Sequence, residues 1–86
     1  MDNTYKKRIF IIEDDEDISK LLRFHLEKEG YKIDISNNGE NIKKKLLTFK
    51  PDLITLDLMI PGSDGFELCK SLKSDAQTAY IPIIMI

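Results

Sequence analysis

Short apolar segments separated by longer amphipathic stretches constrain the fold of this chain more than any other feature. Three of them cover residues 8–12, 53–58 and 81–86, and they are rich in isoleucine and leucine. Apolar runs of this length are typical of strands buried on both faces, as in a parallel sheet. A fourth segment, residues 31–36, alternates apolar and polar residues, as a half-exposed strand does.

The stretches between these strands have helical periodicity. Apolar residues recur every three or four positions, which predicts helices over about residues 17–29, 40–49 and 66–74. Gly30 is a stop signal for the first helix, and the residue before Pro51 is pushed out of the helical region at the end of the second. The residues expected to face inward are Ile18, Leu21, Leu22, His25, Leu26, Ile42, Leu46, Phe49, Phe66, Cys69 and Leu72.

Strands that alternate with helices of this length predict an α/β fold. Each pair of strands with its helix forms a βαβ unit, and right-handed crossovers place helices on both faces of a parallel, doubly wound sheet. The 86 residues are enough for one small domain.

Composition excludes several classes of protein. The formal net charge of −2 argues against nucleic-acid binding, and a single cysteine, Cys69, forms neither an internal disulfide nor a zinc set. No apolar stretch approaches the roughly 20 residues of a membrane span, and the N-terminus lacks the apolar core of a signal peptide. We therefore expect a soluble, cytoplasmic protein.

Acidic residues follow two of the predicted strands. Glu13, Asp14 and Asp15 come directly after the first strand, and Asp57 lies near the end of the third. Ligands of doubly wound sheets bind outside the carboxyl ends of the strands, where the strand order reverses. If the order is 2-1-3, these acids meet at one edge of the sheet.

A buried carboxylate at position 57 requires a partner or a metal, because desolvating a charge is costly. Converging carboxylates raise one another's pKa values, and a divalent cation relieves that repulsion. Mg²⁺ fits, since it takes one or two carboxylates and bridges to phosphate. The same geometry makes Asp57 an oxygen nucleophile towards a phosphoryl donor.

Purely structural interpretations compete with this one. Glu16 and Asp17 are best explained as favourable charges at a helix N-terminus, and Asp57 alone could cap a strand end. A calcium loop of the EF-hand type lacks its alternating ligands and glycine here. We interpret His25 and Cys69 as structural and residues 43–45 as a solvated, basic helix face.

Three segments carry a family resemblance: IFIIEDD at 9–15, PDLITLDLMIPGSDG at 51–65 and IPII at 81–84. Together they resemble the receiver domain of two-component response regulators, over about residues 7–86. The resemblance implies a flavodoxin-like receiver fold with strand order 2-1-3-4.

The resemblance also implies roles for single residues. Asp57 would be the phospho-acceptor, which takes its phosphoryl group from the phosphohistidine of a sensor histidine kinase. Asp14 would bind Mg²⁺ directly, Glu13 through water, and Met59 through its backbone carbonyl. Residues Pro61, Gly62 and Gly65 would shape the following loop, where glycine permits unusual dihedral angles.

Receiver domains of this family continue with a Ser/Thr after the fourth strand, a fifth strand ending in Lys, and further helices. From the resemblance we expect residues 1–86 to be a C-terminally incomplete receiver domain that lacks those elements. Such a domain exposes apolar surface and a strand edge, which favour self-association.

Three functions are compared. The first is a phosphoacceptor signalling module, not an enzyme, that regulates an effector such as transcription in a full-length parent. The second is a phosphatase of the haloacid-dehalogenase type, which also uses an Asp after an apolar strand. It is disfavoured because that class has an Asp-x-Asp pattern, whereas position 59 here is Met. The remaining alternative is a non-phosphorylated interaction or folding fragment.

Overall fold

The computed structural model describes residues 6–58 and 64–86 of the chain. Its elements alternate along the sequence: β1 (Arg8–Ile12), α1 (Glu16–Lys28), β2 (Lys32–Ser36), α2 (Ile42–Phe49), β3 (Leu53–Leu56), α3 (Gly65–Ser74) and β4 (Ile83–Met85). The strands form one sheet in the order β2-β1-β3-β4, and all three neighbouring pairs are parallel. This confirms the predicted α/β class and strand order.

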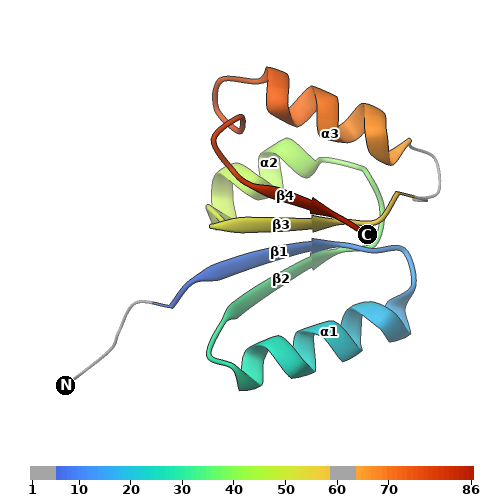
Figure 1. Cartoon of the computed structure of the whole chain (residues 1–86), viewed down its shortest axis with the longest axis vertical. Coiled ribbons are helices and arrows are strands. Elements are labelled where there is room, and N and C mark those ends of the chain that lie inside the picture. Colours follow the sequence, from blue (N-terminus) through green and yellow to red (C-terminus); the bar gives the residue numbers. More distant parts are fainter. Residues whose placement is uncertain (1–5, 59–63) are drawn as a thin grey trace.

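The helices cover both faces of the sheet. Figure 1 shows α1 on one side and α2 and α3 on the other. In β1, Ile9 and Ile11 pack in the cluster on the α1 side, whereas Phe10 and Ile12 belong to the larger cluster beneath α2 and α3. A central strand therefore needs apolar residues at every position, which explains its uninterrupted apolar run.

Local capping sets the ends of α1. The side chain of Asp15 accepts hydrogen bonds from the backbone N–H groups of Asp17 (2.9 Å) and Ile18 (3.2 Å), so it is the N-cap. Gly30 follows the helix with a φ of 96°, a conformation that glycine adopts without steric cost. The predicted stop at Gly30 is confirmed.

The second helix is shorter at its start than predicted. Asn41 adopts a left-handed conformation with a φ of 56°, so regular helix begins only at Ile42. At the other end Lys50, with a φ of 55°, leaves the right-handed helical region before Pro51, as predicted. A residue in the left-handed conformation thus lies at each end of α2.

Four residues predicted to face inward do not. On α1 the sheet-facing residues are Ser19, Leu22 and Leu26, whereas Ile18, Leu21 and His25 are exposed; on α3, Phe66 is 59% exposed. The apolar stripe of α1 is broad, and the sheet covers only one flank of it. Arg23 also lies on the sheet side of α1, where its Nη2 donates to the carbonyl of Ile33 in β2 (3.4 Å).

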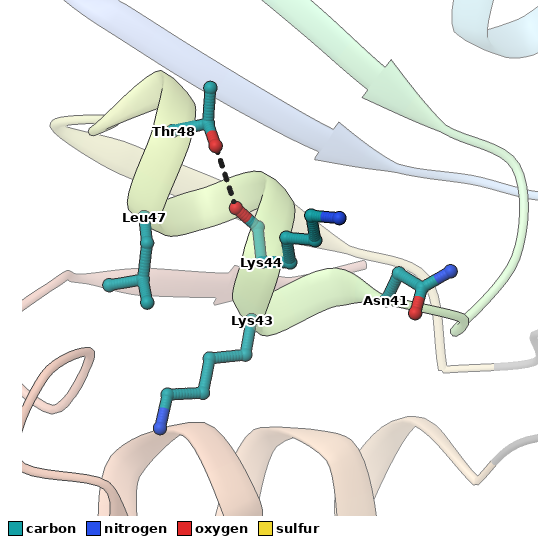
Figure 2. A pocket seen from close by; sticks show the side chains of 5 residues that line it. All are labelled: Asn41, Lys43, Lys44, Leu47 and Thr48. Carbon is teal, nitrogen blue, oxygen red and sulfur yellow. Dashed lines mark hydrogen bonds between the residues drawn. The ribbon is translucent and has the colours of Figure 1, made fainter.

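The basic face of α2 is hollowed but largely solvated. A hollow of about 490 Å³ is lined by Asn41, Lys43, Lys44, Leu47 and Thr48. Figure 2 shows these five side chains. Lys43 reaches towards α3 and forms an ion pair with Asp75 (2.7 Å). Lys43 and Lys44 are exposed, as predicted. For Lys45 the prediction of a solvated position is wrong, because this residue is half-buried and its Nζ donates to the Ser36 hydroxyl (3.2 Å). Across the described ranges, no helix is long and apolar enough to cross a membrane.

Candidate phosphoacceptor and metal site

The strand register brings two chain segments together at the carboxyl edge of the sheet. Ile12 is paired with Leu56, and each is the last residue of its strand. The backbone N–H of Asp57 donates to the carbonyl of Ile12 (3.0 Å), which extends the ladder by one residue. Glu13 and Asp57 consequently leave neighbouring strands side by side.

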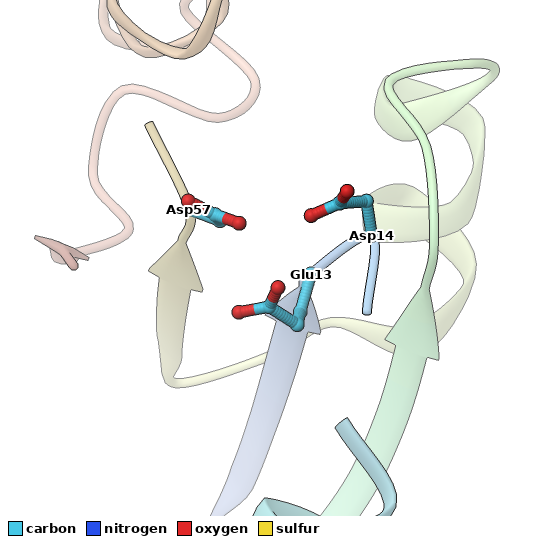
Figure 3. Close-up of side chains that lie close together, drawn as sticks. All are labelled: Glu13, Asp14 and Asp57. Atoms are coloured by element: carbon cyan, nitrogen blue, oxygen red, sulfur yellow. The ribbon is translucent and has the colours of Figure 1, made fainter. Parts of the chain in front are cut away.

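Three carboxylates converge at this edge. Glu13, Asp14 and Asp57 each offer an oxygen, and these oxygens all lie within 4.8 Å of one another. Figure 3 shows the side chains of Glu13 and Asp14, from the end of β1, pointing towards that of Asp57, from the end of β3. The structure thus brings together the three side chains that the sequence analysis singled out.

Glu13 is the buried member of this cluster. Its residue is only 6% exposed. Burial, which disfavours the charged form, raises the pKa of Glu13 from its ordinary value of 4.5 to about 7. A hydrogen bond from the backbone N–H of Asp15 opposes the rise, while the neighbouring carboxyls of Asp57 and Asp14 add to it. The carboxyl of Glu13 therefore keeps its proton to a higher pH than an exposed glutamate does.

This donor set fits a hard divalent cation. Carboxylate oxygens are the ligands that Mg²⁺ prefers, and Mg²⁺ sites commonly combine one or two carboxylates with water. A cation bound by the cluster would offset both the cost of burying the Glu13 charge, which is the main cause of its raised pKa, and the repulsion between the three carboxylates. The observation that supports the fit is the convergence of three acids, one of them buried.

A glycine supports the Asp57 side of the site. A Cβ added to Gly65 would lie 2.7 Å from Leu58 Cα and 2.9 Å from the Asp57 carbonyl oxygen. Its backbone N–H donates to the Leu58 carbonyl (3.2 Å). Gly65 is therefore needed for close backbone packing; the predicted reason, an unusual dihedral angle, is wrong for this glycine. The start of α3 rests directly on the segment that carries Asp57.

Other predicted site residues have different outcomes. Met59, Pro61 and Gly62 lie outside the described residues. Asp15, which adjoins the acidic pair, caps α1 and is not among the clustered acids.

Two residues at the end of β2, Ser36 and Asn37, contact the site and were not predicted as site residues. The backbone N–H of Glu13 donates to the carbonyl of Ser36 (3.0 Å), and Asn37 Nδ2 donates to the carbonyl of Glu13 (2.7 Å). Their position where β2 ends beside β1 is the only sequence signal that could have identified them.

Comparison with known proteins agrees with this geometry. The family model of the response regulator receiver domain matches residues 9–86. The chain belongs to this family. It is a receiver domain of two-component response regulators, a class of signalling domains.

Characterised relatives and solved structures support the assignment. The receiver domain is 44% identical over 80 residues to the alkaline phosphatase synthesis transcriptional regulatory protein PhoP of Bacillus subtilis, covering 93% of this chain and 32% of that protein. It is 43% identical to the transcriptional regulatory protein ResD of the same organism, covering 100% of this chain and 35% of that one.

Among solved structures, the signal receiver domain of the DNA-binding response regulator merR from Colwellia psychrerythraea is similar, with a TM-score of 0.84 and 40% identity, covering 93% of this chain and 67% of that one. A second is the N-terminal domain of a response regulator receiver protein from Methanoculleus marisnigri, with a TM-score of 0.86 and 32% identity, covering 91% of this chain and 63% of that one.

Proposed function

We propose that this receiver domain accepts a phosphoryl group on Asp57 from the phosphohistidine of a sensor histidine kinase, in a Mg²⁺-dependent reaction in the cytoplasm. The observation that carries the proposal is the convergence of Glu13, Asp14 and Asp57 within 4.8 Å at the carboxyl edge of the sheet. The family assignment supports the same chemistry.

In this reaction a carboxylate oxygen of Asp57 attacks phosphorus. A P–O bond forms to that oxygen while the bond between phosphorus and the donor's leaving group breaks. The backbone of Asp57 is held for the attack by its hydrogen bond to Ile12 and by the close contact with Gly65. Asp14 would bind the cation directly, and the buried Glu13 would act through water.

When bound, Mg²⁺ neutralises charge on the phosphoryl oxygens as they approach the acidic cluster. The protein's own contribution is to hold three carboxylates in place before the donor arrives. For the backbone carbonyl of Met59 we keep the sequence-based proposal of a further ligand.

We further propose that a full-length parent uses this domain to regulate transcription, because the relatives PhoP and ResD are transcriptional regulatory proteins. The chain spans about a third of their length, and no direct nucleic-acid contact by these residues is proposed. The proposal also includes self-association through the exposed flank of α1 and the β4 edge, where Leu21 and Ile84 are exposed.

Intact-mass spectrometry tests the central proposal. The chain is incubated with Mg²⁺ and a small phosphodonor, and we expect one adduct of about 80 Da, the mass of an added phosphoryl group. Asp57→Asn removes the nucleophile and should abolish the adduct, as should chelation of Mg²⁺. The matched control is Asp17→Asn, an exposed acid of the first turn of α1, which should retain the adduct.

Each other outcome points to another function. Repeated release of phosphate from an ester, without a stable adduct, would favour a phosphatase. Absence of both adduct and turnover would favour a non-phosphorylated interaction fragment. Persistence of the adduct in Asp57→Asn would place the acceptor on another residue.

A further inference from the structure

The end of β2 holds the backbone of Glu13 at both of its polar groups. Glu13 donates its N–H to the carbonyl of Ser36 (3.0 Å), and its carbonyl accepts from Asn37 Nδ2 (2.7 Å). A carbonyl oxygen can only accept a hydrogen bond, so the nitrogen of the Asn37 amide must face it. Consecutive residues of one strand end thus fix the chain as it leaves the neighbouring strand.

Asn37 has a second anchor on α1. The same Nδ2 lies 3.3 Å from the hydroxyl oxygen of Ser19, which is 2% exposed. The Ser19 hydroxyl in turn donates to the carbonyl of Glu16 (3.1 Å). One amide nitrogen therefore bridges the end of β1 and the first turn of α1.

The contact acts on the acidic cluster through a rigid unit. The carbonyl of Glu13 belongs to the peptide group that joins Glu13 to Asp14, and a peptide group is planar. Fixing that oxygen fixes the rotation of the plane, and with it the directions in which the two acidic side chains leave the backbone. Asn37 itself is exposed, so its side chain contributes little packing.

Cations differ in how much they depend on such fixed geometry. Mg²⁺ requires nearly octahedral ligands at about 2.0–2.1 Å, whereas Ca²⁺ accepts six to eight oxygens at about 2.3–2.6 Å in flexible arrangements. A looser acidic corner therefore penalises Mg²⁺ more than Ca²⁺. A change in net charge would alter the binding of both cations in the same direction.

We propose that Asn37 is a positioning residue for the acidic cluster, and that its contact with the Glu13–Asp14 peptide gives the site its preference for Mg²⁺ over Ca²⁺. The inference rests on the proposed function, because it takes Glu13, Asp14 and Asp57 as the metal site. It adds a residue from β2 to a site otherwise built from the ends of β1 and β3.

Calorimetric titration of the whole chain with Mg²⁺ and, separately, with Ca²⁺ tests this inference. Asn37→Ala should weaken Mg²⁺ binding by about 10-fold, the low end of the effect of losing an outer-shell partner. The same change should weaken Ca²⁺ binding by less than about threefold, since Ca²⁺ tolerates irregular ligands. Asn38→Ala is the matched control: its side chain accepts from the N–H of Glu40 (2.9 Å) and should leave both affinities unchanged.

A second variant separates positioning from charge. Asn37→Asp keeps the size of the side chain, removes the hydrogen-bond donor and adds a negative charge. By electrostatics alone, this charge would strengthen the binding of both cations. Positioning predicts instead that the ratio of Mg²⁺ to Ca²⁺ affinity falls in Asn37→Asp as well as in Asn37→Ala. Thermal unfolding without metal shows that each variant is folded. If Asn37→Ala is unfolded, the affinity ratio of Asn37→Asp alone tests the inference.

The possible failures are distinguishable. If the original chain does not bind Mg²⁺, or if Asp57→Asn binds Mg²⁺ as tightly as the original chain does, the proposed site is wrong. The inference about Asn37 is then wrong as well. If Mg²⁺ binding depends on Asp57 but the affinity ratio is unchanged in both Asn37 variants, only the inference is overturned. A lower unfolding temperature with an unchanged ratio would assign Asn37 a purely structural role.

Discussion

At the scale of single residues, Glu13 has the largest consequence for behaviour in solution. Its pKa rises from 4.5 to about 7, so the folded chain binds a proton that the unfolded chain releases between these pH values. The stabilising contribution of this proton is complete below pH 4.5 and is lost as the pH rises to about 7. A shift of this size corresponds to roughly 3 kcal/mol of unfolding free energy.

We predict that replacing Glu13 changes this pH dependence. In metal-free buffer, Glu13→Gln should remove the loss of stability between pH 4.5 and 7, because glutamine has no charge to desolvate. Urea denaturation at several pH values, followed by circular dichroism, measures the difference from the original chain. Glu67→Gln, an exposed glutamate of α3, is the control. Parallel pH profiles for the original chain and Glu13→Gln would contradict the prediction.

At the scale of elements, the contact between α3 and the end of β3 depends on one missing side chain. A Cβ at Gly65 would meet backbone atoms of Leu58 and Asp57 at 2.7–2.9 Å, and backbone cannot rotate away as a flexible side chain can. The helix must either shift outward or displace the segment that carries Asp57. Both alternatives couple the packing of α3 to the proposed acceptor.

We predict that Gly65→Ala destabilises the fold by about 1–3 kcal/mol, as overpacking does. It should also reduce phosphorylation of Asp57, measured by intact mass. Gly30→Ala is an informative control: its φ of 96° is strained for alanine, but no atom lies within 4 Å of the added Cβ. That control should cost about 1–2 kcal/mol in urea denaturation without affecting phosphorylation. Equal loss of phosphorylation in both variants would argue against a local effect of Gly65.

Much of the fold at this scale could be predicted from the sequence. The run at residues 8–12 ends abruptly in acid, so both the strand and its polar edge are encoded locally. The convergence of Glu13, Asp14 and Asp57 followed from strand order, for which the family motifs were needed. The positions of these three acids could therefore be predicted, because each follows a strand whose place in the order was known.

The features that could not be predicted from the sequence depend on contacts between residues far apart in the chain. The apolar stripe of α1 is broader than the surface it buries, so periodicity alone could not exclude Ile18, which is 46% exposed. Gly65 resembled other loop glycines, because its crowding comes from backbone atoms of Asp57 and Leu58, which follow β3. The contact between Asn37 and Glu13 joins residues 24 apart in the chain, and no local pattern predicts such a hydrogen bond.

At the scale of the whole molecule, the two edges of the sheet differ. On the β2 edge, Asp34 Oδ1 accepts from the N–H of Ile35 (2.9 Å) and Arg23 donates to the carbonyl of Ile33 (3.4 Å). Side chains thereby occupy backbone groups that could pair with another strand. At the other edge, apolar side chains are exposed both in β4 and directly after it: Ile84 is 54% exposed and Ile86 is 61% exposed.

We predict that the 86-residue chain self-associates through the β4 side. Sedimentation velocity should show species of at least twice the mass of one chain, in proportions that increase with concentration. Ile84→Lys should reduce the association, because charge on an edge strand opposes pairing. Leu47→Lys, on the exposed face of α2, should not. A compact monomer at all concentrations would contradict the prediction.

The corner at residues 13–15 has a consequence for which sequence changes this fold can accept. Three consecutive side chains have different roles: those of Glu13 and Asp14 belong to the acidic cluster, and that of Asp15 caps α1. Because β1 runs into α1 across this corner, inserting or deleting one residue would move either the cap or the two acids out of place. The number of residues between β1 and α1 is thus constrained as strongly as the identity of the acids that stand there.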